Sequence, residues 1–288
     1  MAESWWQLSV RTRAASIDAL SNFLIERGAP GVVLKKTGVE AFFPASHAGE
    51  ALRRDVRRFV DAVARLSPGK RKPHLRWRAV RQNNWEHSWK RFIKPRRVGK
   101  SFWVTPPWLQ PAKFRRRRVI TIEPGLAFGT GTHATTRGCM ELLERVCERF
   151  GNRGFTGLDV GTGSGILAIV MAHLGARQVL ALDNDPMALE VAQGNLRVNG
   201  IVTRVCLSGT RLGVIRRRFD VVVANLTAET ILELAGALEK RVARRGFLVL
   251  SGILHTQAGA VVDRFNGRFR VLERKRSREW ATLLLQRT

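Results

Sequence analysis

The sequence lacks any run of about eighteen or more apolar residues, so no segment is long and apolar enough to span a membrane as a helix. It has only three cysteines, at positions 139, 147 and 206, without the paired spacing of a disulfide framework or a zinc site. The first residues lack the basic segment and apolar stretch of a secretory signal peptide. These absences predict a soluble protein of the reducing cytoplasm that holds no metal.

Acidic residues are also scarce, because 23 Asp and Glu stand against 50 Lys and Arg, which gives a net charge of +27. The first 100 residues hold 22 basic and 8 acidic side chains, so this third is about twice as basic per residue as the rest. Such a charge favours contact with RNA or a ribonucleoprotein particle. It is equally typical of a protein that uses arginine as a general surface residue.

Residues 1–82 show the periodicity of a small α+β domain. The pattern predicts strands at 5–11, 31–36, 40–43 and 74–81 and helices at 14–27 and 47–66. This order suits a ferredoxin-like domain. Residues 83–112, rich in Trp, Pro and basic residues, predict a linker with a short helix at about 85–93. Its aromatic residues suit either stacking on nucleobases or anchoring of the linker to the two domains, and we favour anchoring.

Residues 113–288 alternate between apolar strands and amphipathic helices. The expected strands are 119–122, 157–160, 179–182, 204–207, 219–224 and 246–250, and the expected helices are 134–150, 164–174, 186–199, 229–243 and 257–265. Two final strands, 268–275 and 279–286, follow each other without a helix. This order predicts a doubly wound, Rossmann-like α/β domain that ends in an antiparallel hairpin.

A glycine run at 161–165 follows the strand 157–160 and precedes a helix. Its spacing is G-x-G-x-G, with Ile166 in the place of the third glycine of the dinucleotide fingerprint. Asp159 precedes the run, where a carboxylate can stabilise an ammonium group, and Asp183 lies where an acidic residue accepts hydrogen bonds from ribose hydroxyls. The pattern therefore favours S-adenosylmethionine, which has an ammonium and no phosphate, over a dinucleotide.

Two further features indicate an acceptor site. Asn225 follows the apolar strand 219–224, and many amino-group methyltransferases place an Asn or Asp there to accept hydrogen bonds from the incoming amine. Asn225 could equally cap the strand or the next helix. The second feature is the segment 123–136, whose glycines and threonines predict a backbone-lined loop over a ligand. His133 within it is a candidate base or, more commonly for such a residue, a loop-stabilising side chain.

The run Pro124-Gly-Leu-Ala-Phe-Gly-Thr-Gly-Thr-His133 resembles the signature of the bacterial ribosomal protein methyltransferases called PrmA, which modify the large-subunit protein L-eleven. The resemblance extends to Trp85-Glu-x-x-Trp89, Phe102-Trp-Val104, Gly161-x-Gly163-Ser-Gly165, Asp183-x-Asp185-Pro186 and Val222-Val-Ala-Asn225. Where the family usually has Pro, this sequence has Ala134, and Leu226-Thr227 replaces the usual Ile-Leu.

The resemblance implies a substrate-recognition domain at 1–82, a linker at 83–112 and a class I methyltransferase domain at 113–288. It also implies methylation of lysine ε-amines and an N-terminal α-amine, with cofactor contacts at Thr136, Gly161, Asp183 and Asn225. With the glycine run, Asp159 and Gly163 complete the predicted donor site. The basic composition leaves contact with ribosomal RNA, an RNA methyltransferase and a ribosome-associated RNA-binding protein with a vestigial catalytic domain as alternatives.

Overall fold

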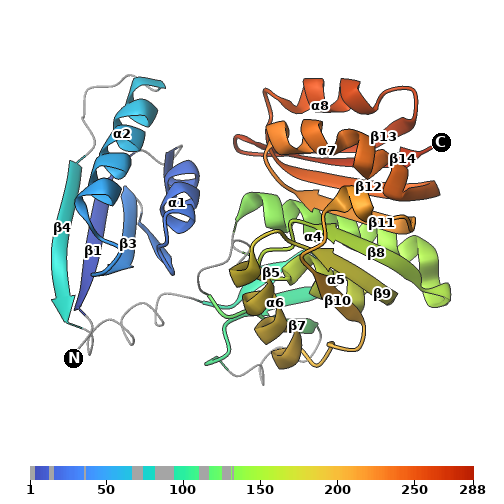
Figure 1. The fold of residues 1–288 in the computed structure, drawn as a ribbon, viewed down its shortest axis with the longest axis horizontal. Coiled ribbons are helices and arrows are strands. Elements are labelled where there is room, and N and C mark those ends of the chain that lie inside the picture. Colours follow the sequence, from blue (N-terminus) through green and yellow to red (C-terminus); the bar gives the residue numbers. More distant parts are fainter. Residues whose placement is uncertain are drawn as a thin grey trace. The chain divides into compact units, whose positions relative to one another are not determined.

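The computed structural model describes residues 4–12, 16–35, 37–66, 74–81, 94–109, 117–124, 131 and 133–288. They form two compact units (Figure 1): the first is made of residues up to Lys94 together with Pro124, and the second of Pro95–Glu123 and the described residues from Gly131 to Thr288. Within these described ranges, no helix is long and apolar enough to cross a membrane. The helix expected at 85–93, with Trp85 and Trp89, lies outside the described residues.

The first unit has the β-α-β-β-α-β element order that the sequence predicts. Its elements are β1 (Ser4–Arg11), α1 (Ile17–Glu26), β2 (Val32–Lys35), β3 (Gly38–Pro44), α2 (Glu50–Leu66) and β4 (His74–Arg81). The four strands form one sheet in the order β2-β3-β1-β4, and every neighbouring pair is antiparallel.

Helices α1 and α2 pack against one face of this sheet. Leu24 of α1 and Val56 of α2 share a buried core with Leu8 and Phe43 of the central strands. Because side chains alternate along a strand, every second residue points to the other face. The expected strand at 74–81 follows this rule, since Trp77 packs against the core while its neighbours on the other face are exposed.

The second unit is built on a seven-stranded sheet, which confirms the expected α/β class. Its strands are β8 (Phe155–Val160), β9 (Ala176–Leu182), β10 (Val205–Ser208), β11 (Phe219–Asn225), β12 (Val242–Leu254), β13 (Phe269–Ser277) and β14 (Trp280–Arg287). They lie in the order β10-β9-β8-β11-β12-β14-β13. The first five are parallel, and β14 pairs antiparallel with both β12 and β13, as the final two expected strands require.

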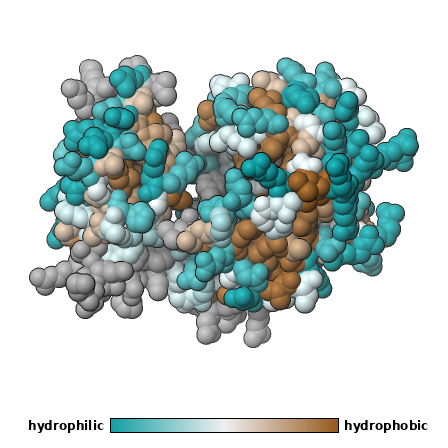
Figure 2. Space-filling model, viewed as in Figure 1, coloured by the Kyte–Doolittle hydropathy of each residue, from teal (hydrophilic) through white to brown (hydrophobic). Residues whose placement is uncertain are grey.

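Helices cover both faces of this sheet (Figure 1). They are α4 (Ala134–Cys147), α5 (Ile166–His173), α6 (Pro186–Val198), α7 (Ala228–Arg241) and α8 (Ala258–Phe265), with short 3-10 turns at Glu148–Arg153 and Leu212–Val214. Residues of α4, α5 and α6 share one buried cluster with Val221 and Val223, and residues of α7 and α8 share the other with Val222 and Ala224. On the visible surface, Figure 2 shows apolar residues over part of this unit, with hydrophilic residues around them.

The strand expected at 119–122 does not join the doubly wound sheet, so that part of the prediction is wrong. It forms β7 (Arg118–Thr121), which lies in a separate three-stranded sheet with β5 (Arg96–Val98) and β6 (Phe102–Thr105). An apolar run of four residues identifies a strand but not its partner. Here the partner is β6, which pairs with β7 in parallel.

A buried glutamate holds this small sheet onto the second unit. Glu144 of α4 is 4% exposed, and its carboxylate accepts hydrogen bonds from the backbone N–H groups of Lys100 at 2.9 Å and Ser101 at 2.8 Å. Gly99 leaves room for this contact, because a Cβ there would lie 2.2 Å from Glu144 Oε2. The later part of the expected linker is therefore a structured part of the second unit.

Candidate donor and acceptor site

The glycine run forms the loop between β8 and α5. Gly161, Gly163 and Gly165 have φ angles of +73°, +53° and +81°, a region that favours glycine. At Gly161 space is limited as well, because an added Cβ would lie 2.4 Å from Leu226 Cδ2. The sequence thus folds here into a tight turn at the carboxyl end of β8, which is where α/β sheets bind ligands.

Asp183 is tied directly to this loop. It follows β9, and its Oδ2 accepts a hydrogen bond from the backbone N–H of Gly163 at 2.8 Å. Its Oδ1 accepts another from the N–H of Asp185 at 3.1 Å, at the start of α6. The backbone N–H of Gly161 donates to the carbonyl of Leu182 at 2.8 Å. The carboxylate is therefore held beside the glycine loop.

Asp159 lies fully buried beneath the loop. Its Oδ2 accepts hydrogen bonds from the Thr162 hydroxyl at 2.7 Å and from the Ala168 N–H at 3.1 Å. Burial raises the pKa of Asp159 to about 7, an effect that the nearby Asp183 carboxylate reinforces and the two hydrogen bonds oppose. The other oxygen, Oδ1, has no hydrogen-bond partner in the described part of the chain. A cationic or donor group of a ligand would satisfy it.

Asn225 ends β11, the strand next to β8. Its side-chain Oδ1 is also buried without a hydrogen-bond partner among the described residues. In the sheet it pairs with Ser251 of β12, whose hydroxyl donates to the Ala281 carbonyl at 3.0 Å and bonds the Thr282 hydroxyl at 2.9 Å. The backbone around Asn225 is thus fixed while its side-chain acceptor stays available to a ligand.

His133 and Thr136 lie at the start of α4. His133 is the N-cap: its Nδ1 accepts a hydrogen bond from the Thr135 N–H at 3.4 Å and lies 2.7 Å from the Thr135 hydroxyl. Its ring packs edge-on against Trp280, with centroids 5.1 Å apart. These contacts hold His133 at the start of α4 and against Trp280. Most of the loop before it, including 125–130, lies outside the described residues.

Thr136 is 0% exposed, and its hydroxyl oxygen has no hydrogen-bond partner within the described ranges. One helical turn further along α4, Cys139 lies close enough to Asp159 for that carboxylate to join burial in raising the pKa of the thiol. A side-chain hydrogen bond with Ser251 opposes this rise. Because Cys139 lies near both Asp159 of β8 and Ser251 of β12, the start of α4 lies beside these two strands. The other site residues lie at the same edge of the sheet.

Comparison with known proteins places the chain in a family. Residues 4–288 match the model of the family described as "Ribosomal protein L11 methyltransferase (PrmA)". The chain belongs to this family. Proteins called ribosomal protein L11 methyltransferase from Citrifermentans bemidjiense and Geobacter sulfurreducens are 35% and 36% identical to it, over 98% and 99% of this chain and 98% of each relative.

A solved structure supports the same family assignment. The crystal structure of ribosomal protein L11 methylase from Lactobacillus delbrueckii subsp. bulgaricus superposes with a TM-score of 0.60 at 33% identity, covering 67% of this chain and 98% of that one. This PrmA-family chain is therefore an S-adenosylmethionine-dependent methyltransferase, as the sequence predicts.

The residues of this PrmA-family chain fit its methyl donor. Within the described part of the chain, Thr136, Asp159 and Asn225 each carry a buried oxygen without a hydrogen-bond partner, and such groups are costly unless a ligand satisfies them. Gly161 lets the loop lie close to Leu226, since a side chain there would meet the Leu226 side chain. Among the described residues, no group of three or more His, Cys, Asp or Glu side chains is placed to hold a metal ion.

Sequence reasoning missed two asparagines that support the site. Asn195 of α6 is 2% exposed; its Oδ1 accepts from the Glu123 N–H at 3.0 Å and its Nδ2 donates to the Ser164 carbonyl at 2.8 Å. It thus connects the chain entering the loop 124–133 with the glycine run. Asn199 bonds both backbone groups of Thr121, at 2.9 and 2.6 Å. Their i, i+4 spacing, which puts them on one helix face, is the signal that could have found them.

Proposed function

We propose that the chain transfers methyl groups from S-adenosylmethionine to amines of a large-subunit ribosomal protein of the L11 type, namely lysine ε-amines, the N-terminal α-amine or both. The observation that carries this proposal is the match of residues 4–288 to the family, together with relatives of nearly the same length that bear this name. A ribosomal protein substrate also implies that the chain works in the cytoplasm.

The donor would be held by the residues at the ends of β8 and β9. Asp159 Oδ1 suits the ammonium of the methionine part, because a cation beside a buried carboxylate offsets the free-energy cost of burying the negative charge. Asp183 suits the ribose hydroxyls. Each of its carboxylate oxygens accepts one backbone hydrogen bond here and can accept a further one from a hydroxyl. Gly161 and Gly163 would bring the backbone close to the donor, and the Thr136 hydroxyl would add one polar contact.

The acceptor amine would be oriented by Asn225. Its buried Oδ1 can accept a hydrogen bond from the amine and so direct the nitrogen lone pair toward the donor. When bound, S-adenosylmethionine supplies a reactive methyl group on a positively charged sulfur. The lysine amine must arrive neutral although its usual pKa is about 10.4, and burial beside Asn225 would lower that pKa. That His133 acts as a base remains a prediction.

We further propose that residues 1–82 recognise the ribosomal protein, that 113–288 carry out the transfer and that 83–112 join the two. Strands β5 and β6 of the joining segment pack within the second unit, which would fix its later part to the catalytic domain. We also propose contact between the basic surface and ribosomal RNA, for which the net charge of +27 is the supporting observation.

The test compares the parent with Asn225→Ala, using radiolabelled S-adenosylmethionine and the recombinant ribosomal protein. We expect label in the protein and a kcat about 100-fold lower in the variant, the usual effect of removing one polar contact to the reacting group. Asn152→Ala, which changes an exposed asparagine in the turn before the start of β8, is the matched control and should keep the parent kcat.

Mass spectrometry of the product then identifies the methylated amines. A parent that binds the donor but labels no ribosomal protein contradicts the proposal. Label that enters RNA and survives protease treatment supports the RNA methyltransferase alternative instead.

A further inference from the structure

The face of the first unit's sheet that points away from α1 and α2 carries a row of basic residues. Arg11 of β1 pairs with His74 of β4 on one side and with Gly38 of β3 on the other, and Gly38 pairs with Lys35 of β2. Residues directly opposite each other in a sheet share a face. His74, Arg11 and Lys35 therefore form one line across all four strands, which spans about 14 Å at 4.8 Å per strand.

A second row lies two residues along the same strands. Arg76 of β4 is opposite Ser9 of β1, and Ser9 is opposite Glu40 of β3. Residues of both rows line a hollow of about 470 Å³ on this face. Gly38 lets β3 lie close to β1 beside the hollow, because a Cβ there would lie 2.1 Å from the carbonyl oxygen of Val10.

The hollow has an excess of positive charge. Among the described lining residues Glu40 is the acidic one, and it forms an ion pair with Lys35 at 3.2 Å. Within the described ranges, no ion pair involves Arg11 or Arg76, and both side chains are exposed. Arginine presents a planar fork of donors that matches phosphate oxygens. The two arginines are therefore positioned to take up negative charge from outside the chain.

The described aromatic residues of this face are not available for base stacking. Trp5 and Phe42 lie on the same face but are each 8% exposed, packed into a small apolar cluster with Val33. Single-strand binding without stacking depends on the phosphate backbone and tolerates any sequence. The row is also much shorter than the footprint of about 16 base pairs that double-stranded RNA modules cover.

We propose that this basic hollow, lined by Arg11, Lys35, His74 and Arg76, binds the phosphate backbone of single-stranded RNA. A cationic surface repels the amines that the proposed function assigns to the acceptor, so the hollow suits a polyanion beside the substrate rather than the methylated groups. The inference deepens the proposed RNA contact by giving it a place, and it does not depend on which protein accepts the methyl group.

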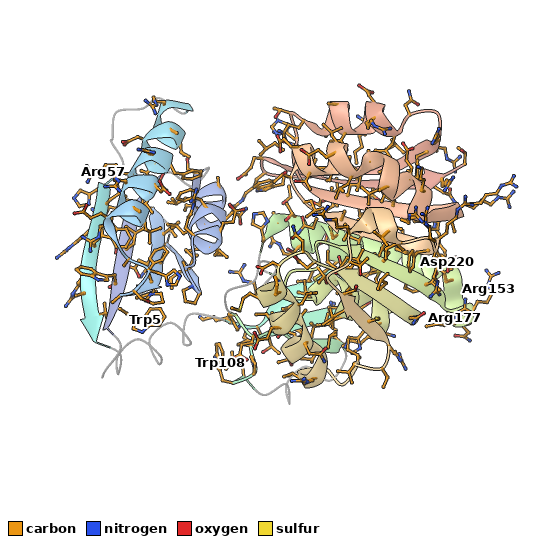
Figure 3. All side chains as sticks on the ribbon, viewed as in Figure 1. Trp5, Arg57, Trp108, Arg153, Arg177 and Asp220 are labelled. Atoms are coloured by element: carbon orange, nitrogen blue, oxygen red, sulfur yellow. The ribbon has the colours of Figure 1, made fainter. Side chains whose placement is uncertain are left out.

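The experiment measures binding of the full chain to fluorescent twelve-nucleotide oligouridylate and oligoadenylate over a range of KCl concentrations. Arg11→Gln with Arg76→Gln is compared with Arg57→Gln and Arg58→Gln on α2, which packs against the opposite face of the sheet. Figure 3 labels Arg57 on this helix. Each of the two double variants removes two exposed positive charges from the first unit.

For the hollow variant we expect the slope of log K against log salt to fall by about 1.4, from two phosphate contacts at about 0.7 each. The loss should be equal for both oligonucleotides, and the α2 variant should keep the parent slope. Thermal unfolding checks that both variants fold.

Equal losses in the two variants would overturn the proposal, because they would show attraction to the overall charge alone. Binding that polyglutamate displaces as readily as RNA does would overturn it in favour of an acidic protein partner. If the parent methylates the ribosomal protein but binds no RNA, only the proposal that the hollow binds RNA is refuted. If the parent binds RNA but transfers no methyl group, only the proposed function is refuted.

Discussion

Replacing Asp159 with asparagine tests the central electrostatic feature of the donor site. The substitution keeps the shape of the side chain and an oxygen that can accept from Thr162 and Ala168, but it removes a charge from a fully buried position. In the parent, burial raises the pKa of this carboxyl to about 7. The folded chain therefore holds a proton there that the unfolded chain, with a usual pKa of about 3.9, releases.

The sign of the effect follows from this difference. The pKa of Asp159 is higher in the folded chain than in the unfolded chain. Its contribution to the free energy of unfolding is therefore fully present below about pH 4, is lost progressively as the pH rises toward 7, and is gone above 7. A difference of about three pKa units corresponds to about 4 kcal/mol at 1.36 kcal/mol each. Asp159→Asn should thus stabilise the ligand-free fold by up to about 4 kcal/mol at pH 8 and by little at pH 4.

The assay is urea unfolding of the parent and the variant at several pH values, with donor binding measured in parallel by calorimetry. The variant should be more stable at pH 8 yet bind S-adenosylmethionine at least about tenfold more weakly, because it lacks the carboxylate that pairs with the ammonium. Asp263→Asn, at an exposed position of α8, is the control. If the variant and the parent lose stability equally between pH 4 and 8, Asp159 is not the buried acid that the structure indicates.

Two other substitutions test the geometry around the loop. Gly161→Ala puts a Cβ at a φ of +73° and 2.4 Å from Leu226 Cδ2, so we expect a loss of about 1–2 kcal/mol in unfolding free energy and weaker donor binding; unchanged donor affinity in calorimetry would contradict this reasoning. Asn195→Ala leaves the Glu123 N–H and the Ser164 carbonyl without their partner, which should cost about 1–3 kcal/mol. As a positioning residue it should raise the KM for the donor more than it lowers kcat, and a pure kcat effect in steady-state kinetics would refute that role.

Periodicity predicted most of the fold because burial and sequence pattern agree along each element. In β11, for example, Val222 and Ala224 face one core while Val221 and Val223 face the other, and a strand buried on both sides appears in the sequence as a continuous apolar run. The helix expected at 186–199 is α6 (Pro186–Val198), which has Pro186 in its first turn.

What could not be predicted depends on contacts between distant segments. The run that became β7 is as apolar as its neighbours, and only its pairing with β6 takes it out of the large sheet. The role of Asn195 requires that α6 lie against both Glu123 and Ser164, 72 and 31 residues away in the sequence. Such partners are properties of the folded chain, and no local pattern contains them.

The sheet order explains why the candidate site lies where it does. Strand order reverses between β8 and β11, because β9 continues on one side of β8 and β12 continues beyond β11 on the other. At such a point the connections leave in opposite directions and open a crevice at the carboxyl ends of the strands. Asp159 on β8 and Asn225 on β11 flank this crevice, and each keeps a buried oxygen without a hydrogen-bond partner among the residues that the structure describes. A fold selected for stability alone would pair or remove both groups, so we infer a ligand site from their presence on the two strands of the reversal.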